Sequence, residues 1–460
     1  MALLIKNGEV ITADSRARAD IYCEGETITR IGSGLEAPPG AQVIDAAGKY
    51  VFPGFVDPHV HITLPFMGTF AKDTYESASK AALVGGTTTL IEMCCPARSE
   101  GALAGFEHWM AQAEGRSACD FTFHMGASRY DDETESALRE IVRRGVSSFK
   151  IFLAYKGAFG IDDGELYRTL RLARELGVVV TAHCENETLV AERQRELIAA
   201  GRTDPGQHHE SRPPAVEAEG VHHMLTFAEL TGAHAYIVHL SCKPALDEAI
   251  AARRRGVRVA IETLIQYLVL DKSLAERGGF EGAKYVMSPP LRDATNQAVL
   301  WDGLRDGLIQ TVATDHAPFD FEGQKRMGAS DFTKIPNGIP SLEERIKLLY
   351  SRGVRAGRID LHTLVNVAST QAAKTFDLFP RKGAIQPGAD ADLVVFDPAY
   401  RGVISAKTQH MNVDYSAFEG WAFEGRPSVV TVRGQVAVRD GAFTGDPSRG
   451  RFLKRTPSRT

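Results

Sequence analysis

Residues 50–65 read YVFPGFVDPHVHITLP, an apolar run that ends in two histidines with one valine between them. Side chains alternate between the two faces of a strand, so His59 and His61 would point the same way. Two imidazoles on one face can hold a metal ion, while two hydrogen-bonded histidines near a strand end are the other interpretation. We predict a buried strand over 50–56 with a bend or bulge at Pro53 and Gly54.

The composition is that of an ordinary soluble globular protein: 460 residues, 43% of them hydrophobic and 24% charged. A formal net charge of −5 without long runs of one sign gives no indication of nucleic acid or a membrane as partner. No apolar stretch is long enough for a transmembrane helix, and the start MALLIKNGEVITAD does not resemble a secretion signal. We therefore expect a cytoplasmic protein.

The six cysteines are too few for a disulfide scaffold in a chain of this length, so we expect reduced, packing side chains. The basic segment RGRFLKRTPSRT, residues 449–460, is expected to be an exposed or intersubunit tail.

Two zones of short β-runs flank the middle of the chain. Residues 1–50 and 380–460 both contain alternating apolar residues separated by glycine and Asp-Gly turns, which is typical of hairpins. We do not expect either zone to form a stable domain by itself. We predict that 1–50 and 380–460 form one small β-sandwich with a C-terminal tail.

Strands and helices alternate over residues 51–379, which favours a parallel sheet. Helical patterns at 163–177, 219–232 and 243–256 separate several of the strands. Eight strands predict an α/β fold, a closed (β/α)8 TIM-like barrel. The candidate strands are 50–61, 87–93, 119–126, 147–154, 177–183, 235–241, 257–263 and 311–316.

Ligand-type side chains stand at the ends of several of these strands. In such barrels the carboxyl ends of the strands carry the active site. Besides the two histidines of the opening segment, these residues are Lys150, His183, His239 and Asp315. Any one of them has a structural explanation, but six on one rim indicate a metal site.

Four imidazoles and one carboxylate suit zinc, while manganese, cobalt and iron are also compatible. Two ions are plausible because these ligands exceed the needs of one open tetrahedral site. A close pair of ions needs a bridging anion, which Lys150 would supply if its neutral amine captured carbon dioxide. A lysine that packs its stem in the barrel is the alternative.

The segments DPHVH, SSFKIFLAYKG, AHCEN, YIVHLSC, YVMSPPLR, ATDHAPF and DFTKIPNG, in this order, resemble those of cyclic amidohydrolases, specifically the dihydropyrimidinase and D-hydantoinase family. The resemblance spans nearly the whole chain. It implies two zinc ions per subunit, with Mn²⁺ and Co²⁺ as substitutes. It places His59, His61 and Asp315 on the more buried ion and His183 and His239 on the other, with N6-carboxylysine at Lys150 between them. It also implies a homotetramer.

The implied reaction is hydrolytic ring opening of a cyclic amide or imide by a metal-activated bridging hydroxide. Dihydropyrimidines would give N-carbamoyl-β-amino acids, and 5-substituted hydantoins would give N-carbamoyl amino acids. Asp315 would move the proton and Tyr155 would donate to the oxyanion. Ser288 and Asn337 would bind the ring edge, mainly through backbone groups, and an apolar pocket for the substituent would comprise Leu64, Phe66, Phe152 and Phe159.

Three positions differ from the family pattern. Cys184 stands where relatives often have alanine, and we expect it to be a small buried hydrophobe. Glu92 and Arg98, in EMCCPARSE, are expected to alter the mouth of the site.

Three other functions are compatible with the same fold. A dihydroorotase would carry an arginine at the position of Thr63, and an allantoinase generally lacks a tyrosine like Tyr155. A non-catalytic dihydropyrimidinase-related scaffold protein would have lost metal ligands, whereas all six positions are filled here.

Overall fold

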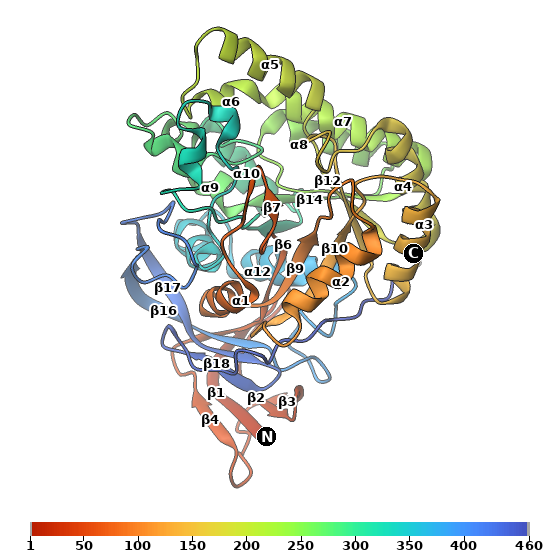
Figure 1. The fold of residues 1–460 in the computed structure, drawn as a ribbon. Helices are drawn as coiled ribbons and strands as arrows, with labels where there is room; N and C mark the ends of the chain where they lie inside the picture. Colours follow the sequence, from red (N-terminus) through yellow and green to blue (C-terminus); the bar gives the residue numbers. More distant parts are fainter. Residues whose placement is uncertain (1, 458–460) are drawn as a thin grey trace.

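Eight parallel strands form a nearly closed barrel in the computed structural model, which describes residues 2–457 (Figure 1). Val60 forms a parallel bridge to His316, just past the last strand, and this bridge brings the two edge strands together. The strands are short, apolar and buried on both faces, as expected for a parallel sheet covered by helices. They are β6 (Phe55–Val60), β9 (Thr87–Cys94), β10 (Asp120–Gly126), β11 (Ser148–Phe152), β12 (Val179–His183), β13 (His234–Ile237), β14 (Val259–Leu264) and β15 (Thr311–Ala313).

Helices connect consecutive strands and cover the outside of the barrel (Figure 1). In α4 (Asp163–Leu176), Asp162 and Glu165 cap each other's backbone N–H groups, and Gly177 ends the helix with a φ of 70°. The other connecting helices are α1 (Tyr75–Val84), α2 (Ala102–Ala113), α3 (Asp132–Arg143), α5 (Glu187–Ala199), α6 (Gln207–Ser211), α7 (Pro214–Thr231), α8 (Lys243–Arg254), α9 (Ile265–Val269) and α10 (Thr295–Arg305). Three short helices follow the barrel: α11 (Arg345–Leu348), α12 (Leu361–Val365) and α13 (Gln371–Thr375).

A separate, mostly antiparallel sheet lies below the barrel in Figure 1 and contains strands from both ends of the sequence. Its strands run in the order β19-β18-β17-β16-β5-β1-β2-β3, with β4 beside β1. Leu3, Val51, Leu393 and Val429 belong to its own hydrophobic core. The bounds are β1 (Ala2–Ile11), β2 (Arg16–Glu24), β3 (Thr27–Gly32), β4 (Gln42–Asp45), β5 (Tyr50–Pro53), β16 (Leu393–Val403), β17 (Ala422–Val432), β18 (Gln435–Arg439) and β19 (Ala442–Phe443).

The predicted fold class, a (β/α)8 TIM-like barrel with a small β-sandwich from both chain ends, is confirmed: the barrel is present, and strands from both chain ends form a separate sheet. The division at residues 50 and 380 remains a prediction. Among residues 2–457, helices that combine the length and apolarity needed to cross a bilayer are absent.

The prediction of one strand over 50–56 is wrong, because the chain changes sheets at Gly54. β5 pairs with β16 in the chain-end sheet, while β6 pairs with β9 in the barrel. The Gly54 N–H donates to the Asp392 carbonyl at 2.7 Å, and a Cβ at this position would lie 2.1 Å from Oγ1 of Thr88. Only glycine fits this close crossing between the two sheets.

The C-terminal segment is not the exposed tail that its basic composition suggested, as far as the structure describes it. Leu453 and Arg455 are buried, and the Arg455 guanidinium donates to Ser148 Oγ and Thr122 Oγ1 at 3.1 Å each. This contact ties the segment to β10 and β11. Residues 458–460 lie outside the described part of the chain, and an intersubunit role remains a prediction.

Candidate metal and substrate site

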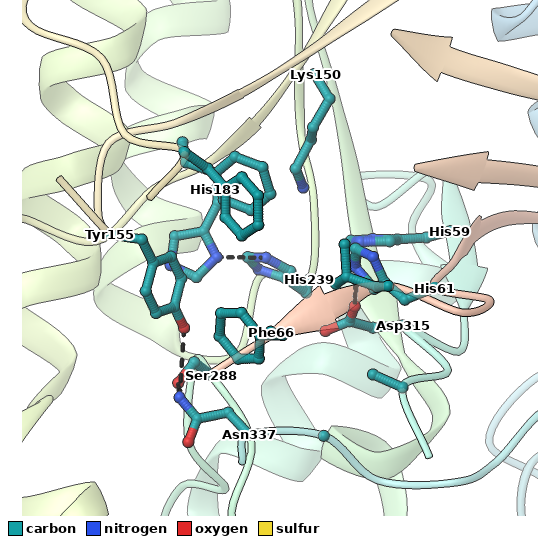
Figure 2. A pocket seen from close by; sticks show the side chains of 15 residues that line it. His59, His61, Phe66, Lys150, Tyr155, His183, His239, Ser288, Asp315 and Asn337 are labelled. Atoms are coloured by element: carbon teal, nitrogen blue, oxygen red, sulfur yellow. Dashed lines mark hydrogen bonds and ion pairs between the residues drawn. The ribbon is translucent and has the colours of Figure 1, made fainter. Parts of the chain in front are cut away.

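One cavity at the carboxyl ends of the barrel strands brings together every side chain that the sequence singled out as a ligand or substrate contact (Figure 2). β6 and the hairpin of β7 (Pro65–Phe66) and β8 (Thr69–Phe70) supply one wall, and the segment after β11 supplies another. The lining residues are His59, His61, Leu64, Phe66, Lys150, Phe152, Tyr155, Phe159, His183, His239, Ser288, Asp315, Ala317, Asn337 and Gly338.

His59 and His61 share one oxygen of Asp315. The Nε2 atom of each imidazole lies 3.1 Å from Oδ1 of the carboxylate. Ligand atoms that surround a tetrahedral ion at about 2.0–2.2 Å are themselves about 3.3–3.6 Å apart. The three side chains therefore have the spacing of ligands around a single divalent ion.

His183 and His239 form a second pair of donors. Nδ1 of His183 lies 2.9 Å from Nε2 of His239, and the other ring nitrogen of His183 lies 2.9 Å from Glu185 Oε2. We assign the proton of His183 to Nε2, facing the carboxylate, which leaves the Nδ1 lone pair facing His239. This pair also fits a divalent ion.

Lys150 projects from β11 into the space between the two groups, as Figure 2 shows. Its side chain is about 1% exposed, and within residues 2–457 no acceptor lies within hydrogen-bonding distance of Nζ. Burial lowers the pKa of the Lys150 ammonium. A buried amine with a lowered pKa and without an acceptor fits a lysine that reacts as the neutral base.

The electrostatics of the cavity favour neutral imidazoles. Burial lowers the pKa of His59, His183 and His239, and neutral imidazole is the form that binds a metal. Burial would raise the pKa of Asp315, but His59, the hydrogen bond from His61 and Lys150 together lower it. Asp315 is therefore held as a carboxylate.

Glu262 on β14 supports the ligands from behind. Its Oε1 lies 2.7 Å from Nδ1 of His59 and accepts the backbone N–H of His239 at 3.0 Å. Burial raises the pKa of this carboxyl to about 8, against hydrogen bonds from Tyr236 and His239. Such an outer partner fixes which ring nitrogen of His59 points into the site.

Glu185 and Arg212 orient the second histidine pair in a similar way. Glu185 accepts from His183 and from the buried Arg212 guanidinium, whose carbon lies 5.6 Å from the centre of the Tyr155 ring. Arg212 thus contacts both the second histidine pair, through Glu185, and the ring of Tyr155.

Tyr155 faces Ser288 and Asn337 across the cavity. Asn337 Nδ2 donates to Ser288 Oγ at 3.0 Å and to the Tyr155 hydroxyl oxygen at 3.4 Å. Burial raises the pKa of the Tyr155 phenol, so the hydroxyl keeps its proton near neutral pH. Because the oxygen accepts from Asn337, its own proton is available to a ligand.

Aromatic rings close the cavity around Tyr155. Phe66 packs edge-on to the Tyr155 ring at 5.4 Å between centroids and stacks near Phe159 at 6.3 Å. Phe152 lies 5.5 Å from Phe159. Together with Leu64 these rings form an apolar wall, and it reaches the nitrogen donors where the Phe152 ring lies 5.8 Å from the His183 ring.

Three of the functional side chains come from backbone in the left-handed region. The φ angles are 61° at Tyr155, 41° at His239 and 47° at Asp315. Residues other than glycine adopt this conformation at a cost of about 1–3 kcal/mol each. The fold maintains it where the chain turns out of a strand and aims a side chain into the cavity.

The predicted role of Glu92 at the mouth is wrong, whereas that of Arg98 remains a prediction. Glu92 is buried and accepts the backbone N–H of Ile62 at 2.8 Å. Arg98 binds the Ser128 and Gly160 carbonyls and Glu165, which fastens the loop after β11. The expectation for Cys184 is confirmed, since it is 2% exposed, and all six cysteines are free and buried.

Sequence reasoning missed Glu262, Glu185, Arg212, His208 and Lys325. Glu262 had a usable signal, because it ends an apolar strand as the ligands do. Glu185 directly follows β12 and bonds His183 two residues away, so it had a local signal too. Arg212, His208 and Lys325 lie after α6, in α6 and in a short turn, and their partners are distant in sequence. His208, for example, bonds the Met287 carbonyl at 2.9 Å and Ser288 Oγ at 3.2 Å.

Comparison with known proteins finds relatives that match this chain over nearly its whole length. Residues 50–437 match the Amidohydrolase family. A D-hydantoinase from Geobacillus stearothermophilus is 46% identical, with 99% of this chain and 97% of that protein covered. A dihydropyrimidinase from Rattus norvegicus is 36% identical, with 99% and 89% covered.

Solved structures also match this chain over nearly its whole length. A D-hydantoinase (dihydropyrimidinase) from Thermus sp. is 65% identical, with a TM-score of 0.98 and 99% of each chain covered. An L-hydantoinase (dihydropyrimidinase) from Arthrobacter aurescens is 30% identical, with a TM-score of 0.90 and coverage of 98% of this chain and 99% of that one.

Proposed function

The chain belongs to the amidohydrolase family and is an enzyme that opens cyclic amides by hydrolysis, and from this premise we propose that it acts on 5-substituted hydantoins and 5,6-dihydropyrimidines. The products are N-carbamoyl amino acids and N-carbamoyl-β-amino acids. One observation carries the proposal: Tyr155, Ser288 and Asn337 meet opposite the imidazoles, so a cyclic imide can contact both sides of one cavity.

The family has a binuclear metal centre, and we propose zinc as the metal, with Mn²⁺ or Co²⁺ as substitutes. His59, His61 and Asp315 hold one ion, and His183 and His239 hold the other. Two observations support this assignment. Nε2 of His59 and of His61 each lie 3.1 Å from Oδ1 of Asp315, and Nδ1 of His183 lies 2.9 Å from Nε2 of His239. When bound, two such ions lower the pKa of a shared water and polarise the substrate carbonyl.

As N6-carboxylysine, Lys150 would supply carboxylate oxygens to both ions in this proposal. Its neutral amine adds to carbon dioxide and loses a proton, which yields a carbamate with two oxygens. The support is the buried Nζ between the two ligand groups, with a lowered pKa.

The chain's own residues then perform the remaining steps. Asp315 accepts the proton of the attacking water and delivers it to the leaving ring nitrogen. The Tyr155 hydroxyl donates to the carbonyl oxygen as negative charge develops there. Ser288 and Asn337 hold the imide or ureide edge of the ring, and the wall of Leu64, Phe66, Phe152 and Phe159 receives the substituent.

The position of Thr63 favours these substrates over dihydroorotate. A substrate carboxylate needs a cation, whereas the Thr63 hydroxyl donates to the Gln112 side chain at 2.7 Å. The buried Arg212 is already paired with Glu185.

The first test is ring-opening rates of zinc-replete enzyme on dihydrouracil, 5-substituted hydantoins, allantoin and dihydroorotate. We expect turnover of the first two classes, and their ratio tells which is preferred. Turnover of allantoin or dihydroorotate alone would refute the proposed substrates.

Lys150→Ala tests the bridge, with the exposed Lys156→Ala as the matched control. We expect the first variant to lose bound metal and activity and the second to keep both. Reconstitution of metal-free parent enzyme with zinc should depend on bicarbonate. Full metal content in Lys150→Ala would refute the bridge.

We also propose a homotetramer, on the basis of the family resemblance. Light scattering of the purified protein should give four times the chain mass, and a monomer would refute this assembly.

A further inference from the structure

Lys325 begins a short 3₁₀ turn (Lys325–Gly328) behind the substrate end of the cavity. Its side chain is fully buried, and its Nζ donates to three backbone carbonyls. The acceptors are Val286 at 3.0 Å, Pro336 at 2.7 Å and Gly338 at 2.7 Å. Neither the metal ligands nor the lining of the cavity includes this residue.

The three acceptors match the three N–H bonds of an ammonium. Burial lowers the pKa of Lys325 well below its usual value. A neutral amine has two N–H bonds and an ammonium has three, so Nζ donates to at least two of these carbonyls in either form. The Lys325 head group is therefore a buried donor that three carbonyl dipoles surround.

These carbonyls belong to the two segments that carry Ser288 and Asn337. Val286 stands two residues before Ser288, and Pro336 and Gly338 flank Asn337 on both sides. The segments are also joined directly, since the Gly338 N–H donates to the Val286 carbonyl at 2.9 Å. The Lys325 Nζ thus fastens both segments from behind.

The wall is tightly packed where it meets the cavity. A Cβ at Gly338 would lie 2.2 Å from the Ala317 carbonyl oxygen, so this backbone has little space to shift. A backbone contact to a ligand at Ser288 or Asn337 depends on the position of this wall, and substitution of those two side chains leaves the backbone contact in place.

We propose that Lys325 is the positioning residue of the ring subsite and sets substrate affinity through the backbone of residues 286–288 and 336–338. This inference rests on the proposed function, because it assumes that a cyclic imide lies against these segments. Lys325 touches no reacting atom, so its loss should affect binding of the ring in the ground state and transition state alike.

Lys325→Met, which keeps the length of the side chain and removes all three donors, is the test variant. We expect KM for dihydrouracil or a hydantoin to rise about tenfold to hundredfold, the value of one to two hydrogen bonds, with a much smaller change in kcat. Bound metal should equal that of the parent. Lys325→Gln, which retains two N–H donors, should have an intermediate KM and serves if the methionine variant does not fold.

The matched control is Lys382→Met. Lys382 is equally buried, but its Nζ pairs with Asp120 and Asp392 at 2.6 Å each, away from the cavity. We expect this variant to lose thermal stability and to keep the KM of the parent. An unchanged KM in a folded Lys325 variant would overturn the proposal, as would an equal rise in KM in the Lys382 control.

Hydrogen–deuterium exchange supplies a readout that needs no substrate. Exchange in Lys325→Met should increase in peptides covering 284–291 and 334–340 and stay unchanged in those covering 148–155. A parent enzyme silent on both substrate classes would refute the proposed function, and exchange would then decide the role of Lys325. An increase in exchange throughout the chain, or no increase in these two segments, would overturn the proposed role of Lys325.

Discussion

Nδ1 of His183 and Nε2 of His239 face each other at 2.9 Å, and Glu185 orients the first of these rings from the opposite side. The same cavity places His59 and His61 around Asp315 as a separate group. The two groups come from different strands, so they can be altered one at a time.

Replacement of His239 by alanine should remove about half of the bound metal. The second ion loses a ligand, while the ligands of the first, which bind through a different set of strands, are unchanged. Elemental analysis of the purified variant measures the loss, and the exposed His222→Ala provides the control. Loss of all metal, or of none, would show that the two ligand groups do not act as separate sites.

Removal of the Tyr155 hydroxyl should lower kcat about 10²–10³-fold, as for other oxyanion donors. Tyr155→Phe keeps the packing against Phe66 at 5.4 Å, so KM should change little. Steady-state kinetics separates the two parameters, with the exposed Tyr167→Phe as control. A kcat close to that of the parent would exclude Tyr155 as the donor.

Chelation should lower the midpoint of thermal unfolding, and zinc should restore it. The ligands converge only in the folded chain, so a bound ion stabilises the native state by mass action. Differential scanning calorimetry with and without chelator measures the shift. Lys150→Ala should show a smaller shift than the parent, and an equal shift would contradict the bridging role of that lysine.

Glu344, which precedes α11 and lines a cavity with Tyr400 and Phe423 of the chain-end sheet, should make the protein less stable as the pH rises. Burial raises the pKa of this carboxyl to about 8, with Lys347 opposing and Glu343 adding to the effect. The neutral form is favoured in the native state, so its contribution is full below the unfolded pKa of 4.5 and is lost as the pH approaches 8. Glu344→Gln should therefore gain stability relative to the parent between these values.

Glu343→Gln is the control of opposite sign. Lys347 and His410 lower the pKa of Glu343 to about 2 in spite of burial, so its stabilisation is present above 4.5 and is lost as the pH falls toward 2. Urea unfolding at pH 5 and pH 9 measures Glu344→Gln, and unfolding at pH 3 and pH 5 measures Glu343→Gln. A Glu344→Gln difference that is the same at both pH values would contradict the assignment.

The convergence of the proposed metal ligands was predictable because each lies at or near the end of an apolar strand, and barrel topology brings the strand ends to one rim. His59, His183 and Asp315 illustrate this. Gly54 shows the limit: Pro53 and Gly54 suggested a bulge, but only the pairing of β5 with β16 reveals that the chain changes sheets there. Lys325 was beyond prediction because its partners are carbonyls, which every residue possesses.

The pairing of Pro53 with Leu393 has a consequence for biosynthesis. A ribosome that adds about 5–20 residues per second needs roughly 20–70 s to make the roughly 340 residues between them. During that time β1–β5 carry an unpaired edge at Tyr50–Pro53 and half of a hydrophobic core whose other half, Leu393 and Val429 included, has not been made. The nascent chain is therefore most exposed to aggregation, and most dependent on chaperones, at its earliest segment.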